Sequence, residues 1–176
     1  AGVNCVRFHF LDRVAPRGLI AAGRSDTRVL DPAQLERLDF FVAELKRRGI
    51  YTNLNLNVAR TYLPGDGVKD HELLGFAKAL TFFDPRLREL QREYARQLLT
   101  HRNPHTGATY AEEPAVAIVE LVNENSLVEA WMNGRLRGTN VRRNPGTWTD
   151  IPASYAADLD ARFKVWLRER HSAEQV

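Results

Sequence analysis

Residues 50–58 read IYTNLNLNV, and this stretch decides between the folds that are open to the chain. Its β-branched and aromatic residues predict a strand, in which successive side chains point to opposite faces. Asn53, Asn55 and Asn57 therefore share one face, while the apolar side chains share the other. A parallel strand covered by helices on both faces would instead be apolar throughout. One face of this strand must meet polar neighbours or a polar ligand.

Two further stretches predict strands with the same division: residues 3–11, VNCVRFHFL, and residues 115–122, AVAIVELV. Arg7 and His9 share a face of the first. On the third, alternation places Glu120 and Glu124 on one face and Leu121 on the other. Because burying an unpaired ionised group is costly, we expect Arg7 to pair with Glu120 or Glu124.

Three helices are predicted between and after these strands. Asp31-Pro32 and Asp84-Pro85 each place a capping residue before a proline, and Pro152 opens a third apolar stripe. We expect Trp166 to lie in the core, because it falls on that last stripe. The order strand, helix, three times over, predicts a parallel sheet of the α/β class.

Such a sheet is either doubly wound or closed into a (β/α)₈ barrel. Neither GxGxxG nor GxxxxGK[ST] follows a predicted strand. The polar strand faces and the long loops after the strands favour the barrel, whose strand-to-helix loops build the active site. We therefore expect residues 1–176 to form one α/β domain, an incomplete TIM barrel of about three β/α units, truncated at both ends.

Composition excludes several classes of function. The 176 residues carry 25 basic and 22 acidic side chains, spread along the chain, which does not indicate a nucleic-acid partner. A single cysteine, Cys5, excludes an internal disulfide. No apolar run is long enough to span a membrane. The histidines lack the spacing of metal ligands, so we expect no metal and no cofactor.

Asn123-Glu124 closes the most apolar predicted strand. Catalytic groups of (β/α)₈ barrels lie at this end of the strands, and a partly buried carboxyl there suits a general acid. Asn123 can hydrogen-bond a sugar hydroxyl. Strict alternation puts the two side chains on opposite faces, so a bulge or a loosened strand end is needed for both to reach one ligand.

These residues resemble the general acid/base signature of clan A glycoside hydrolases. The chain is similar to the portion from the second strand to the fourth helix of a cellulase-type, family-five member. VNCVRFHFLD resembles the second strand, with Arg7 at the position of the active-site arginine; GIYTNLNLNVAR resembles the third and AVAIVELVNENSL the fourth. Many relatives carry His where this chain has Asn57.

The resemblance implies hydrolysis of β-linked oligo- or polysaccharides with retention. Glu124 would be the general acid/base, while the nucleophilic Glu would lie in a C-terminal half outside this chain, so that residues 1–176 alone would be inactive. It also implies a carbohydrate substrate and an extracellular or periplasmic location. The expected substrate-binding residues are Asn123, Arg7, Asn57, His9, Trp131 and Tyr62.

Two alternatives remain for the function. In a catalytically inactive, carbohydrate-binding barrel, Glu124 would only contact the ligand. A lyase or aldolase barrel would require an inward Lys or a phosphate loop, and neither falls on the three predicted strands. Local packing is the alternative role for the loop aromatics Tyr62, Trp131 and Trp148, and a structural ion pair is the alternative role for Glu120.

Overall fold

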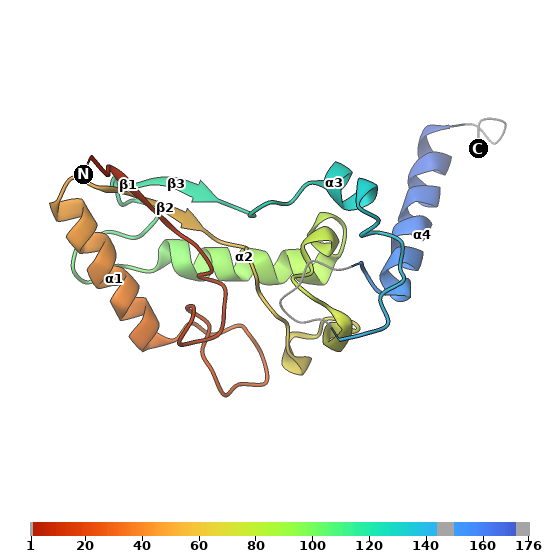
Figure 1. The fold of residues 1–176 in the computed structure, drawn as a ribbon, viewed down its shortest axis with the longest axis horizontal. Helices are drawn as coiled ribbons and strands as arrows, with labels where there is room; N and C mark the ends of the chain where they lie inside the picture. Colours follow the sequence, from red (N-terminus) through yellow and green to blue (C-terminus); the bar gives the residue numbers. More distant parts are fainter. Residues whose placement is uncertain (1, 144–149, 172–176) are drawn as a thin grey trace.

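The computed structural model describes residues 2–143 and 150–171 and contains a three-stranded parallel sheet in the order β1-β2-β3 (Figure 1). Helices α1 and α2 lie along one side of this sheet, and α3 and α4 lie beyond its end. The elements are β1 (Cys5–Phe8), α1 (Pro32–Arg47), β2 (Tyr51–Asn55), α2 (Pro85–Thr100), β3 (Val116–Glu120), α3 (Leu127–Met132) and α4 (Ala153–Arg170), with 3₁₀ turns at Pro64–Asp66, His71–Leu73 and Lys78–Phe82. The predicted parallel α/β architecture is confirmed, with shorter strands.

The helices begin where the sequence predicts. The Asp31 carboxylate accepts hydrogen bonds from the backbone N–H groups of Ala33 and Gln34, both at 3.0 Å. Asp84 caps α2 in the same way through the N–H of Leu87, at 2.8 Å. In each case a proline follows at the first position of the helix, where a backbone N–H group would have no acceptor within the helix. Local sequence alone therefore sets both helix starts.

The register of the sheet separates a polar face from an apolar one. Arg7 pairs with Asn53, and Asn55 pairs with Glu120, so these four side chains point to one side. Phe8, Leu54 and Val119 form a row on the opposite side and pack in the main hydrophobic core. Paired residues of neighbouring strands share a face. The alternation in the sequence thus predicts this division correctly.

Two hydrophobic clusters hold the elements together. The first joins the apolar face of the sheet to α1 and α2, with Leu54 and Val42 fully buried at its centre. The second lies around the first half of α2 and the 3₁₀ turns, with Leu87 and Leu80 fully buried. Both clusters lie on the helix side of the sheet or beyond it, which leaves the polar face open.

Helix α4 differs from its expected role. Tyr155, in its first turn, is buried in the second cluster, but Phe163 and Trp166 are 55% and 44% exposed. The prediction that Trp166 lies in the core is therefore wrong for this structure. The reason is geometric: α4 projects away from the sheet, so that its later turns extend beyond the other elements (Figure 1).

Candidate active site on the polar sheet face

The polar face centres on the carboxylate of Glu120. Arg7 donates through Nε to Oε1 at 2.7 Å and through Nη2 to Oε2 at 2.6 Å. Asn53 Nδ2 donates to Oε1 at 2.6 Å, and Asn55 Nδ2 donates to Oε2 at 2.8 Å. We call Arg7, Asn53, Asn55 and Glu120 the Glu120 cluster. Two of the three alternating asparagines thus serve to hold one carboxylate.

The electrostatics of this cluster keep Glu120 ionised. The hydrogen bond from Arg7 lowers the pKa of Glu120 to about 2, against the opposing effect of partial burial. The same bond raises the pKa of Arg7. A carboxylate that accepts four donors and stays charged is poorly suited to donate a proton. The expected ion pair is therefore present, and Glu120 has the geometry of a positioning group.

Asn123 joins the same face from beyond the end of β3. Its Oδ1 accepts a hydrogen bond from Arg7 Nη2 at 2.7 Å, and its backbone N–H donates to the Asn57 carbonyl at 2.9 Å. Strict alternation from Glu120 would have turned Asn123 away. The ladder of β3 ends at Glu120, and Asn123 turns towards Arg7 in the loosened segment that follows.

Glu124 follows in a left-handed backbone conformation, with φ of +44°. Such a conformation is uncommon and strained for a residue with a Cβ, and it breaks the alternation of a strand. The Glu124 side chain is exposed, so the partial burial expected for this carboxyl is not provided by the described residues. Its negative charge acts on Arg7, His9 and Lys78, which places it beside the Glu120 cluster.

Lys78 is a site residue that the sequence reasoning missed. It lies in the third 3₁₀ turn, is 3% exposed, and donates from Nζ to the Asn123 carbonyl at 2.8 Å. Burial lowers the pKa of Lys78, while the charge of Glu124 opposes that effect. Asn125 donates from Nδ2 to the Lys78 carbonyl at 3.2 Å. No local motif marks this lysine, because the turn reaches the strand end only through the tertiary fold.

His9 lies at the edge of the same face. Its Nδ1 is 3.5 Å from Asn55 Nδ2, and its ring packs against that of Phe10 with centroids 4.2 Å apart. Partial burial, followed by the charge of Arg7, lowers the pKa of His9. The imidazole is therefore neutral near pH 7 and can exchange hydrogen bonds with a polar ligand.

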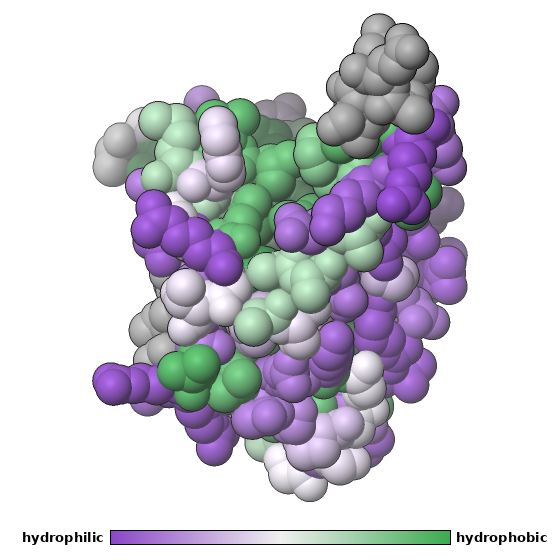
Figure 2. Space-filling model, turned by 90° about the vertical axis from the view of Figure 1, so that its right-hand side faces the viewer, coloured by the Kyte–Doolittle hydropathy of each residue, from purple (hydrophilic) through white to green (hydrophobic). Residues whose placement is uncertain are grey.

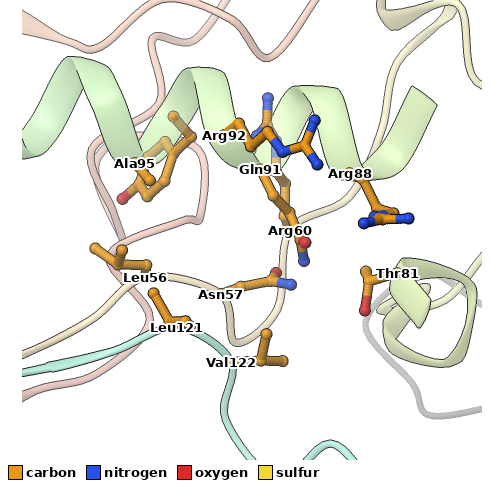
Figure 3. Close-up of a pocket in the computed structure, with 11 residues that line it drawn as sticks. Leu56, Asn57, Arg60, Thr81, Arg88, Gln91, Arg92, Ala95, Leu121 and Val122 are labelled. Carbon is orange, nitrogen blue, oxygen red and sulfur yellow. The ribbon is translucent and has the colours of Figure 1, made fainter. Parts of the chain in front are cut away.

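The remaining predicted binding residues lie apart from this cluster. Asn57 lines a separate cavity against α2 (Figure 3), so the expected row of three amides is reduced to two. Tyr62 is 2% exposed and packs within the second hydrophobic cluster. Its ring is therefore buried and cannot stack on a sugar. Trp131, in α3, is 72% exposed. Trp148 lies outside the described residues.

Trp131 belongs to an apolar stretch at the end of the molecule that carries α3 and α4. Met132 and Val128 are also largely exposed there, at 74% and 63%. Figure 2 views this end and shows hydrophobic surface between hydrophilic stretches. An exposed tryptophan face beyond the carboxyl ends of the strands is placed where a sugar could stack on it.

Asp12 is a buried residue that holds the backbone after β2. Its Oδ2 accepts hydrogen bonds from the backbone N–H groups of Val58, Ala59 and Arg60, at 2.8, 2.9 and 2.9 Å. Burial raises the pKa of Asp12, and these three hydrogen bonds oppose the rise. The carboxyl therefore fixes the path of the chain just after β2.

The described residues contain neither a candidate metal site nor a membrane-spanning helix. Across residues 2–143 and 150–171, no group of three or more His, Cys, Asp or Glu is arranged to hold a metal ion. Within the same ranges, no helix has both the length and the apolar character needed to cross a membrane.

Comparison with known proteins gives a consistent set of relatives. The chain is 31% identical over 111 residues to mannan endo-1,4-beta-mannosidase 2 of Arabidopsis thaliana, covering 60% of this chain and 24% of that protein. It is 27% identical over 124 residues to mannan endo-1,4-beta-mannosidase 4 of Oryza sativa subsp. japonica, covering 62% and 26%. The chain thus spans about a quarter of the length of these curated relatives. No family model matches it.

Among solved structures, the chain is similar to the hyperthermostable endo-1,4-beta-D-mannanase from Thermotoga petrophila RKU-1. The identity is 27%, the TM-score is 0.43, and the match covers 60% of this chain and 28% of the mannanase. The resemblance to cellulase-type glycoside hydrolases, which the sequence indicated, is confirmed by its relatives: over the matched segment, the chain is similar to mannan endo-1,4-beta-mannosidases.

Proposed function

We propose that this chain is part of a (β/α)₈ barrel that hydrolyses the β-1,4 linkages of a mannan-type polysaccharide with retention of configuration. The substrate is the one named for its relatives. The polar sheet face supports the barrel, because a closed barrel would enclose Arg7, Asn53, Asn55 and Glu120. Residues 1–176 would then be one partial catalytic domain.

In this proposal Glu124 protonates the leaving glycosidic oxygen and then deprotonates the attacking water. The observation that carries it is the Arg7–Asn123 hydrogen bond, 2.7 Å long, directly beside an exposed Glu124 in a strained conformation. Glu120 accepts four hydrogen bonds and remains charged, so it holds Arg7 in place. A strained backbone conformation that the surrounding residues hold in place is frequent at functional sites.

The mechanism needs a second carboxylate, about 5–5.5 Å from the first, to act as the nucleophile. Glu120 does not suit that role, because Arg7 and two amides already occupy both of its oxygens. We assign the nucleophile to a Glu of the protein outside residues 1–176. The chain by itself would therefore bind sugar without hydrolysing it.

The proposal uses three sugar-binding residues on the polar face and a fourth, Trp131, that lies apart from that face in α3. Asn123 and Arg7 would contact the sugar next to the bond that is cleaved, and neutral His9 would contact a hydroxyl. Trp131 would stack on a neighbouring sugar ring. Tyr62 is left out, because it is buried.

The test is hydrolysis of β-1,4-mannan by the full-length protein, with the anomer of the product identified by NMR. We expect a β product, and a kcat that falls by at least about 100-fold in Glu124→Gln. The matched control is Glu129→Gln, which removes an exposed carboxylate five residues further on and should stay within about twofold of the wild type. A full rate in Glu124→Gln would contradict the proposal. Mannan binding without hydrolysis by the wild type would support the inactive barrel instead.

A further inference from the structure

A cavity of about 280 Å³, with both polar and apolar walls, lies between α2 and the segment that follows β3 (Figure 3). It shares no residue with the Glu120 cluster. Asn57 enters it from the segment after β2, and Gln91 enters it from α2. The cavity is therefore a separate place on the molecule at which a ligand could bind.

Three buried polar atoms of this cavity lack an observed hydrogen-bond partner. They are Asn57 Nδ2, Gln91 Nε2 and Tyr94 Oη, judged over the described part of the chain. Asn57 and Tyr94 are each only 5% exposed. Burial raises the pKa of Tyr94 far above its ordinary value, so the phenol keeps its proton and can donate. A buried donor without an acceptor is destabilising, so a ligand that accepts these hydrogen bonds would be favoured here.

The charge of the cavity has one sign. Arg60, Arg88 and Arg92 line it, and none of the described lining residues is acidic. Arg60 is fixed, because it donates to Thr27 Oγ1 at 2.9 Å and to the Leu90 carbonyl at 3.1 Å. Arg88 and Arg92 are exposed and lie one turn apart on α2, on the same face. Two guanidinium groups at a cavity mouth favour a carboxylate or another oxyanion.

The other walls of the cavity are apolar, and they favour an organic anion over an inorganic one. Leu56, Leu121 and Val122 line the side opposite the arginines. An inorganic anion would leave these walls without contacts, whereas an organic ligand would cover them. The geometry points to a binding site for a sugar-sized hydroxy acid, such as a hexuronate. Its carboxylate would lie between Arg88 and Arg92, and its hydroxyl oxygens would accept from Asn57, Gln91 and Tyr94. This inference does not rest on Glu124 or on the proposed hydrolysis.

The test is calorimetric titration of the purified protein with D-glucuronate, D-glucose and inorganic phosphate in separate experiments. We expect glucuronate to bind at least about tenfold more tightly than either glucose or phosphate, since charge-assisted hydrogen bonds and the apolar walls each contribute. Arg88→Ala/Arg92→Ala should weaken glucuronate binding at least about tenfold, and Gln91→Leu should weaken it severalfold.

The matched control is Arg96→Ala, which removes an exposed arginine one turn further along α2, outside the cavity. It should leave glucuronate binding within about twofold of the wild type. Thermal unfolding of each variant shows that α2 remains folded. The inference is overturned if glucuronate does not bind, if glucose or phosphate binds as tightly, or if Arg96→Ala weakens binding as much as the double variant does.

Discussion

Arg7 and Glu120 lie on the two edge strands of the sheet and meet over the central strand, with paired contacts of 2.7 and 2.6 Å. The side-chain amides of Asn53 and Asn55, on the central strand β2, donate two further hydrogen bonds to the Glu120 carboxylate. The contact ties all three strands together on the polar face, opposite the hydrophobic core. It also turns one nitrogen of Arg7 towards Asn123. The geometry of the strand ends thus depends on this pair.

The first prediction concerns acid stability. The hydrogen bond from Arg7 lowers the pKa of Glu120 from an ordinary value of 4.5 to about 2 in the folded state. Folding then favours the ionised form, so the contribution is complete above pH 4.5 and is lost as the pH falls towards 2. Urea unfolding from pH 6 to pH 2 should show a smaller loss of stability in Glu120→Gln than in the wild type. Equal pH dependence of the two proteins would contradict the assignment.

The second prediction concerns the apolar face of the central strand. Leu54 is fully buried between the sheet and the helices, whereas Leu121 is 71% exposed just after β3. Leu54→Ala should lower the free energy of unfolding by about 3 kcal/mol, because it removes buried methyl groups and leaves a cavity. Leu121→Ala should change it by less than about 0.5 kcal/mol. Urea denaturation measures both, and similar values for the two variants would refute the described core.

The third prediction concerns the carboxyl that holds the chain after β2. Asp12→Ala leaves the N–H groups of Val58, Ala59 and Arg60 without their acceptor in a buried position. We expect a loss of about 3 kcal/mol in the free energy of unfolding. Asp12→Asn, which keeps one acceptor oxygen, should lose less. Asp160→Ala, an exposed aspartate of α4, serves as the control and should be close to neutral.

The fourth prediction concerns Trp131 as a sugar platform. Under the proposed function, Trp131→Ala should raise the KM of the full-length protein for mannan several-fold, about 1 kcal/mol of binding, with little change in kcat. Trp131→Phe should restore most of the affinity. Met132→Ala provides a neighbouring exposed control, with 74% exposure. If both alanine variants raise KM equally, the effect comes from the helix and not from the indole.

The sequence predicted the features that depend on local rules. Asp31-Pro32 and Asp84-Pro85 placed two helix starts, and alternation placed Arg7 and Glu120 on one face. Parallel pairing followed from the order of the elements. The helix starts and the strand faces need only hydrogen bonding and side-chain periodicity, which act over a few residues.

The features that it missed depend on distant contacts. Lys78 reaches Asn123 across 45 positions, and Asp12 reaches Arg60 across 48. Alternation also fails where a strand ends, so Asn57 and Asn123 leave their expected faces. Trp166 lies on the apolar face of α4, but the sequence pattern of a helix does not show whether another element packs against that face. Only the folded arrangement settles such points.

The most direct test of the proposed role of Glu124 compares leaving groups in the full-length protein. An aryl β-mannoside with a strongly acidic phenol needs no proton donor, whereas mannan does. Glu124→Gln should therefore lose at least about 100-fold in rate on mannan and keep most of the glycosylation rate on the aryl substrate. Added azide, which needs no general base, should then restore turnover and give a β-mannosyl azide. Equal losses on both substrates, with no rescue by azide, would contradict the assignment of Glu124 as the general acid/base.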